Sequence, residues 1–123
     1  MPWTTPNPDA VAAEDRRLRY ELLKLLHAER INPCGGWVTA RYALDIVSMP
    51  MTIADRPPSE DRVMGLLTDL VDKGLAIFED NRNERGQVYG VDYATYKITG
   101  NGTSFVLRSR PADADIDDGR IVR

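Results

Sequence analysis

Apolar residues recur at helical spacing in three separate stretches of the chain. The first stretch predicts a helix that begins at Pro8, with Asn7 as its N-cap, and that ends before the turn residues Asn32 to Gly36. Its apolar positions follow the i, i+4, i+7, i+8 pattern of a helix with one buried side. They are Leu18, Leu22, Leu25 and Leu26.

Two shorter helices are expected in the middle of the chain. Thr39 can cap a helix from Ala40 to about Met49, and Ser59 can cap a third helix from Glu60 to Lys73. Gly74 is suited to end the third helix because glycine readily adopts positive φ. The third helix has a clear amphipathic pattern. Its apolar residues are Val63, Leu66, Leu67 and Leu70.

The part of the chain after Gly74 predicts strands joined by a polar turn. Leu75–Phe78 is a short strand, and Val88–Ile98 is a longer one rich in tyrosine and β-branched residues. Residues 81–87 between them form a polar turn. Trp37 and Val38 can add a third strand. Helix, strand, turn and strand therefore predict a small sheet beside a group of helices.

A last short helix is expected after the second strand, capped by Thr99 and ended by Pro111. With this helix in place, the apolar pattern predicts one core. The residues expected to be buried are Leu22, Leu26, Leu44, Val63, Leu67, Leu70, Leu75, Ile77, Tyr96 and Ile98.

Two local patterns resemble the winged helix-turn-helix superfamily. Leu66 to Leu75 is similar to the "L-x-x-L-x-x-K-G-L" end of a recognition helix, and Tyr96 to Gly102 is similar to the "Y-x-L-T-x-x-G" exit from a wing. Asp15-Arg16-Arg17-Leu18 and Arg110-Pro111 also look like small winged-helix proteins of Mu-like phages and prophages. The resemblance implies a mainly α, α+β fold with a three-helix core, a two- or three-stranded wing and a short C-terminal helix.

The chain departs from that family in two places. Ser48 to Pro58 forms a connection of about eleven residues, whereas a helix-turn-helix uses about 3–4. Gly100 and Asn101 replace the usual charged pair after the wing. Because of this long connection, the third helix is not expected to have the usual docking geometry of a helix-turn-helix in a DNA groove.

Length and composition indicate one domain of 123 residues with ordinary apolar and charged content. We expect an extended arm at residues 1–8, the winged-helix domain at 9–110 and an acidic, flexible tail at 111–123. The single cysteine, Cys34, allows no internal disulfide, and no apolar run reaches the ~18 residues of a membrane helix. The expected location is cytoplasmic.

DNA binding is the function that the resemblance implies, and the net charge of −3 requires any such binding to use a local basic patch. The third helix is a poor source of one, because Ser59 to Lys73 contains four acidic and two basic residues. The predicted wing has two arginines near its tip, and these can hold phosphate or enter a minor groove. The candidate DNA-binding residues are Arg56, Ser59, Arg62, Thr68, Arg82, Asn83 and Arg85.

The sequence therefore predicts one function and leaves an alternative open, since the resemblance favours the first and the charge of the third helix favours the second. The first is a DNA-binding protein similar to a small bacterial or phage transcriptional regulator. The second is a winged helix used as a protein–protein interaction module in a phage or nucleoprotein assembly, with its partner at the acidic third helix. In the first case we expect a homodimer, formed through the N-terminal arm with Trp3 and a second apolar side of the first helix at Tyr20 and Leu23.

Catalytic patterns are missing from the sequence. His27 stands at a helix end without a serine, cysteine or acidic cluster in a recognisable arrangement, and Cys34 has no second ligand at zinc-binding spacing. Neither a GxGxxG pattern nor a P-loop occurs. The sequence therefore predicts no enzyme, no metal and no cofactor.

Overall fold

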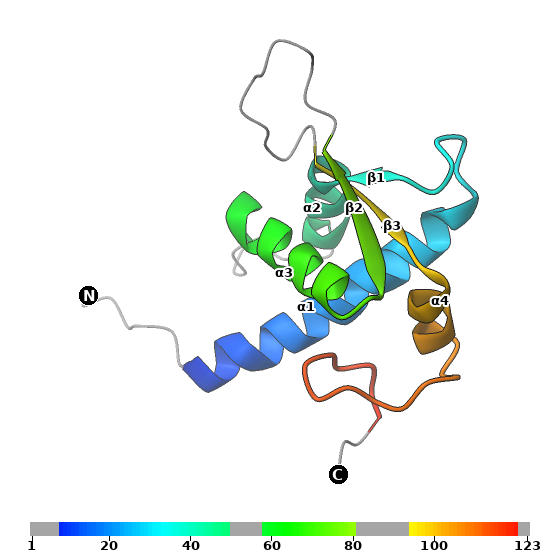
Figure 1. Cartoon of the computed structure of the whole chain (residues 1–123). Coiled ribbons are helices and arrows are strands. Elements are labelled where there is room, and N and C mark those ends of the chain that lie inside the picture. The colour runs from blue at the N-terminus through cyan, green and yellow to red at the C-terminus, as the bar shows by residue number, and fades with distance from the viewer. Residues whose placement is uncertain (1–7, 50–57, 81–93, 121–123) are drawn as a thin grey trace.

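The computed structural model describes residues 8–49, 58–80 and 94–120 (Figure 1). In these ranges four α-helices pack with a three-stranded antiparallel sheet, which is a mainly α, α+β fold consistent with a winged helix. The elements are α1 (Pro8–Ala28), a 3₁₀ turn (Glu29–Ile31), β1 (Val38–Thr39), α2 (Ala40–Ser48), α3 (Glu60–Asp72), β2 (Ala76–Asp80), β3 (Ala94–Ile98) and α4 (Gly100–Val106).

The predicted N-caps at the starts of α2, α3 and α4 are confirmed. The hydroxyl oxygens of Thr39, Ser59 and Thr99 each accept a hydrogen bond from the backbone N–H three residues later, at 3.1–3.2 Å. Each bond satisfies one of the N–H groups that a helix start leaves without a partner. The first helix begins at Pro8 as predicted, and its expected cap, Asn7, lies outside the described residues.

The sheet has the strand order β1-β3-β2, so β3 is its centre. Val38 lies opposite Tyr96, and Tyr96 lies opposite Phe78 on the other side. The expected third strand is thus present as β1, shifted to Val38–Thr39. The expected strand from 88 onward is described only from Ala94, and the predicted wing turn at 81–87 falls outside the described residues.

The core agrees with most of the predicted set. Eight of the ten expected residues are buried, and Leu44 is partly buried. The prediction was wrong for Ile77, whose side chain is 45% exposed. Ile77 lies opposite Lys97 in the register, on the side of the sheet that faces away from buried Tyr96 and Ile98. Leu23 was also misplaced, because it is fully buried in the core and leaves no apolar pair with Tyr20 for a dimer interface.

The C-terminal segment packs on the domain, where the sequence predicted a flexible tail. We call residues 111–120 the C-terminal strap. Ile116 is 2% exposed within the main core, and the backbone N–H of Asp117 donates to the carbonyl of Arg16 on α1 at 3.0 Å. The Arg120 guanidinium lies 5.3 Å from the centre of the Phe105 ring on α4. The strap therefore runs beside α1 and α4 and completes the core (Figure 1).

The surroundings of Gly102 explain why the wing-exit pattern has a glycine at this position. A Cβ atom at this position would overlap the backbone carbonyl oxygen of Leu75 and the side chain of Ile98. The hydroxyl of Thr99 also donates to the carbonyl of Gly74 at 2.7 Å. The start of α4 is therefore held directly against the backbone that leads from α3 into β2.

We predict that Gly102→Ala destabilises the domain by about 1–3 kcal/mol or more, because the added methyl group would have to displace backbone atoms. Gly100→Ala is the matched control, since a Cβ at Gly100 in the same helix would meet no atom within 4 Å. Urea denaturation of both variants measures the difference. Equal stabilities would show that α4 does not pack as described.

Candidate functional site

The outward side of α3 carries carboxylates at its two ends. Asp61, Gly65, Thr68 and Asp72 are exposed and follow one another at helical spacing of four, three and four residues. We call these four residues the α3 stripe. Among the described residues, none forms an ion pair or hydrogen bond with the side-chain carboxylate of Asp61 or Asp72.

Arg62, one of the candidate DNA-binding residues, points to α1 instead of solvent. Its Nε lies 2.7 Å from a carboxylate oxygen of Asp15, and its Nη1 lies 3.4 Å from Glu14. The side chain is 27% exposed. Two carboxylates thus neutralise the single arginine of α3, which reduces the attraction of this helix for phosphate.

Ser59 and Thr68 also use their hydroxyl groups within the domain. Ser59 is the N-cap of α3, and the Thr68 hydroxyl donates to the carbonyl of Met64 at 2.8 Å. Thr68 remains exposed on the α3 stripe. The other candidates, Arg56, Arg82, Asn83 and Arg85, lie outside the described residues.

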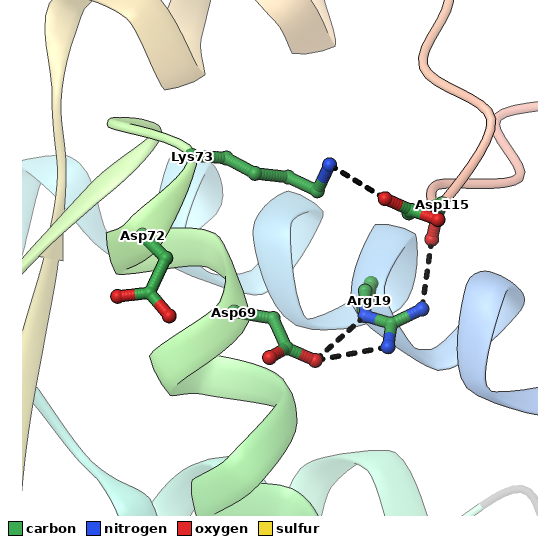
Figure 2. Close-up of a pocket in the computed structure, with 5 residues that line it drawn as sticks. All are labelled: Arg19, Asp69, Asp72, Lys73 and Asp115. Carbon is green, nitrogen blue, oxygen red and sulfur yellow. Dashed lines mark hydrogen bonds and ion pairs between the residues drawn. The ribbon is translucent and has the colours of Figure 1, made fainter.

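A polar pocket of about 310 Å³ opens beside the C-terminal half of α3 (Figure 2). Arg19 of α1, Lys73 at the end of α3 and Asp115 of the strap line it together with Asp69 and Asp72. Its lining thus comes from three separate segments of the chain. All five of these lining residues are charged, two of them basic and three acidic.

Both cations of the pocket are already paired. Arg19 donates to Asp69 at 2.9–3.0 Å and to the backbone carbonyl of Asp115 at 3.0 Å. Lys73 Nζ lies 2.8 Å from Asp115 and 3.0 Å from Asp113. Asp72 is the lining carboxylate that takes part in none of the interactions drawn in Figure 2. Among these five lining residues, the carboxylate of Asp72 is therefore the one left unpaired, and it is the last residue of the α3 stripe.

The pKa values of Lys73 and Asp115 are shifted by their contact. The hydrogen bond from Lys73 lowers the pKa of Asp115, and the bond to Asp115 raises the pKa of Lys73. Burial of Asp118 favours its neutral form, yet hydrogen bonds from Arg120 outweigh burial and lower the pKa of this carboxyl. The strap is therefore held by charged groups that keep their charge at neutral pH.

Sequence reasoning missed the residues of the strap. Asp113, Asp115 and Asp118 read as a charged tail, and the one usable signal was Ile116, an apolar residue between acidic neighbours. The partners of these residues lie far away in the sequence, since Lys73 is 40 positions before Asp113. No local pattern could have joined them.

Other reactive groups lie apart from the α3 stripe. His27 is at the end of α1, where burial and then the nearby Arg30 charge lower its pKa. Cys34 is exposed in the turn after α1. Within residues 8–49, 58–80 and 94–120, no group of three or more histidine, cysteine or acidic residues could hold a metal ion, and no helix is long and apolar enough to cross a membrane.

Comparison of the chain with protein-family models, curated proteins and solved structures finds no match. The likeness to a winged helix therefore depends on the order of helices and strands and on the residues described above.

We predict that the acid stability of the domain depends on the strap. A carboxyl whose pKa is lowered in the fold stabilises it above the ordinary pKa of about 3.8, and this contribution is lost as the pH falls through the lowered value. Lys73 acts in the opposite direction, because its contribution is lost only above its ordinary pKa of 10.5. Asp118→Asn should therefore lower the free energy of unfolding at pH 7. It should also flatten the dependence of that free energy on pH below about 5.

Urea denaturation at a series of pH values measures this effect. Asp45→Asn, on the exposed side of α2, is the control and should leave the pH dependence unchanged. An Asp118→Asn curve parallel to that of the parent would contradict the assignment.

Proposed function

We propose that the chain is a protein-interaction module of winged-helix type, which docks a positively charged partner on the α3 stripe. The observation that supports this proposal is the pair of carboxylates, Asp61 and Asp72, exposed and without partners among the described residues. The neighbouring cations, Arg62 and Lys73, are paired with other acidic residues. Such a surface repels phosphate and attracts lysine and arginine.

The spacing of the α3 stripe describes the partner that would fit. Asp61 and Asp72 are eleven residues apart, which corresponds to roughly 16 Å along a helix. Gly65 and Thr68 between them are small, and a Cβ at Gly65 would meet no atom within 4 Å. A helix or strand could therefore approach α3 closely in the middle and place a basic side chain near each end.

A second candidate function is duplex DNA binding as a small transcriptional regulator, and the fold supports it. The arrangement of helices and sheet is consistent with a winged helix, and the segment between β2 and β3 contains Arg82, Asn83 and Arg85. Arg56 precedes α3 in the sequence. In this case the wing would supply the phosphate contacts, because the charge of α3 is unfavourable.

We predict that Asp61→Asn with Asp72→Asn weakens binding of a lysine-rich helical peptide roughly five- to thirtyfold, as expected from two exposed ion pairs of about 0.5–1 kcal/mol each. Fluorescence anisotropy at low and moderate salt measures it. A matched control, Asp45→Asn with Glu21→Gln, changes the net charge equally at exposed positions on α2 and α1. Equal weakening by both double variants would show attraction by net charge alone and would contradict a site on the α3 stripe.

Random duplex DNA in the same assay distinguishes the second candidate. If the wing holds DNA, Arg82→Ala with Arg85→Ala should lower affinity on every sequence alike and reduce the salt slope by about one to two phosphate contacts. Asp61→Asn with Asp72→Asn should then strengthen DNA binding, since it removes repulsion. A parent protein with no salt-dependent DNA binding leaves only the protein-interaction proposal.

A further inference from the structure

The C-terminal strap lies on the domain in the way that a bound peptide would. Its own hydrogen bonds hold its turns, since the carboxylate of Asp113 accepts from the backbone N–H of Asp115 at 2.8 Å and the N–H of Ile116 donates to the carbonyl of Asp113 at 3.1 Å. Two further turns follow at 117–119 and 118–120, where an aspartate carboxylate accepts from the backbone N–H two residues later. The strap therefore has a shape that its own sequence specifies.

An apolar anchor and two backbone hydrogen bonds hold the strap on the helices. Ile116 is the anchor, 2% exposed within the core. On one side of it, Arg19 donates to the carbonyl of Asp115 at 3.0 Å (Figure 2). On the other side, the N–H of Asp117 donates to the carbonyl of Arg16 at 3.0 Å. Side-chain anchors combined with main-chain hydrogen bonds are a usual way for a protein surface to recognise a peptide.

The charges of the strap match those of the surface beneath it. Lys73 Nζ lies 3.0 Å from Asp113 and 2.8 Å from Asp115, and the Arg108 guanidinium donates to the carbonyl of Asp118 at 3.2 Å. The strap itself has four acidic residues and one basic residue. We give the name strap-binding face to the four basic residues of the domain that contact it, Arg16, Arg19, Lys73 and Arg108.

We propose that the strap-binding face is a docking site for an acidic segment of a partner protein, in which one apolar residue lies between carboxylates. The strap occupies this site within the chain and acts as a built-in competitor. This inference goes beyond the proposed function, because the α3 stripe would take a basic partner and the strap-binding face takes an acidic one.

The apolar anchor favours a protein segment over a nucleic acid as the incoming ligand. Both are negatively charged, so the cations alone do not distinguish them. A departing strap would open the site of Ile116 to water, and exposure of apolar surface is unfavourable. A protein segment with a matching apolar residue closes that site again, whereas a sugar-phosphate backbone has no group that would fill it.

The junction between α4 and the strap is suited to release. Arg108 has a φ of +61°, which residues other than glycine rarely adopt. Such a conformation persists when surrounding contacts impose it, and the bond from Arg108 to the strap is one of these contacts. The ion pair of Lys73 with Asp115 is also open to water, since the Asp115 side chain is 64% exposed. Exchange can therefore begin at this ion pair.

Fluorescence anisotropy with a labelled synthetic peptide of residues 110–120 tests the exchange on the full chain. In the parent, the strap competes at an effective concentration on the order of millimolar, so the peptide should bind weakly. Ile116→Ala in the chain removes the anchor of the strap and should raise the affinity for the peptide by about tenfold or more. Asp113→Asn with Asp115→Asn keeps the anchor and the core, and should raise the affinity about two- to fivefold.

Ile31→Ala and Val47→Ala are the matched controls in the chain. Ile31 is 82% exposed and Val47 is buried in α2, so the two variants test an apolar truncation alone and a weakened core. Neither should change the affinity for the peptide, and circular dichroism checks that each variant folds. The Ile116→Ala form of the peptide should bind the opened chain about tenfold more weakly than the parent peptide does.

Several results would overturn the proposal. These are equal peptide affinity in the parent and both strap variants, equal binding of the Ile116→Ala peptide, or equally increased affinity in the Val47→Ala chain. Random duplex DNA in the same assay tests the other anionic ligand. Strap variants that gain affinity for DNA and none for the peptide would assign the strap-binding face to phosphate and would also overturn the proposal.

Discussion

The contact between α1 and α3 determines which side of α3 faces solvent. The apolar residues of both helices lie in one core, and two charged contacts flank it: Arg62 of α3 with Asp15 of α1, and Arg19 of α1 with Asp69 of α3. Both arginines are less than one-third exposed. Rotating α3 would break these ion pairs and expose Leu66 and Leu67 together, so the helix has one favourable orientation.

This orientation also decides what α3 can recognise. A recognition helix meets DNA with neutral or basic side chains on its outward side. Here the cations of the α1–α3 contact point inward, and the α3 stripe keeps its two carboxylates outward. The same scaffold can serve DNA or protein recognition, and the choice depends on which positions carry the charges. In the described residues, the charge on α3 is therefore the basis of the proposed basic protein partner.

Local signals in the sequence were sufficient for most of the fold. The caps Thr39, Ser59 and Thr99 each mark a helix start, because a side-chain oxygen there accepts a backbone bond within three residues. Ile77 was misassigned because four consecutive apolar residues, Leu75 to Phe78, do not alternate with polar ones and so do not show which of them face the core. Arg62 read as a DNA contact because its partner, Asp15, lies 47 residues earlier. The strap was expected to be flexible because its composition is mostly polar. Composition does not show that a single apolar residue, Ile116, fills a gap in the core.

The strap makes the outer surface more acidic in a way that net charge does not reveal. It contributes Asp113 and Asp115 to Lys73, and its backbone accepts a bond from Arg19. Both cations would otherwise face solvent near the end of α3 and offset Asp72. Because they are engaged by other carboxylates, neither cation pairs with Asp72, the acidic residue at the end of the α3 stripe. The burial of Ile116 thus has an electrostatic consequence: it fixes the acidic strap where it neutralises the cations that a phosphate-binding helix would need.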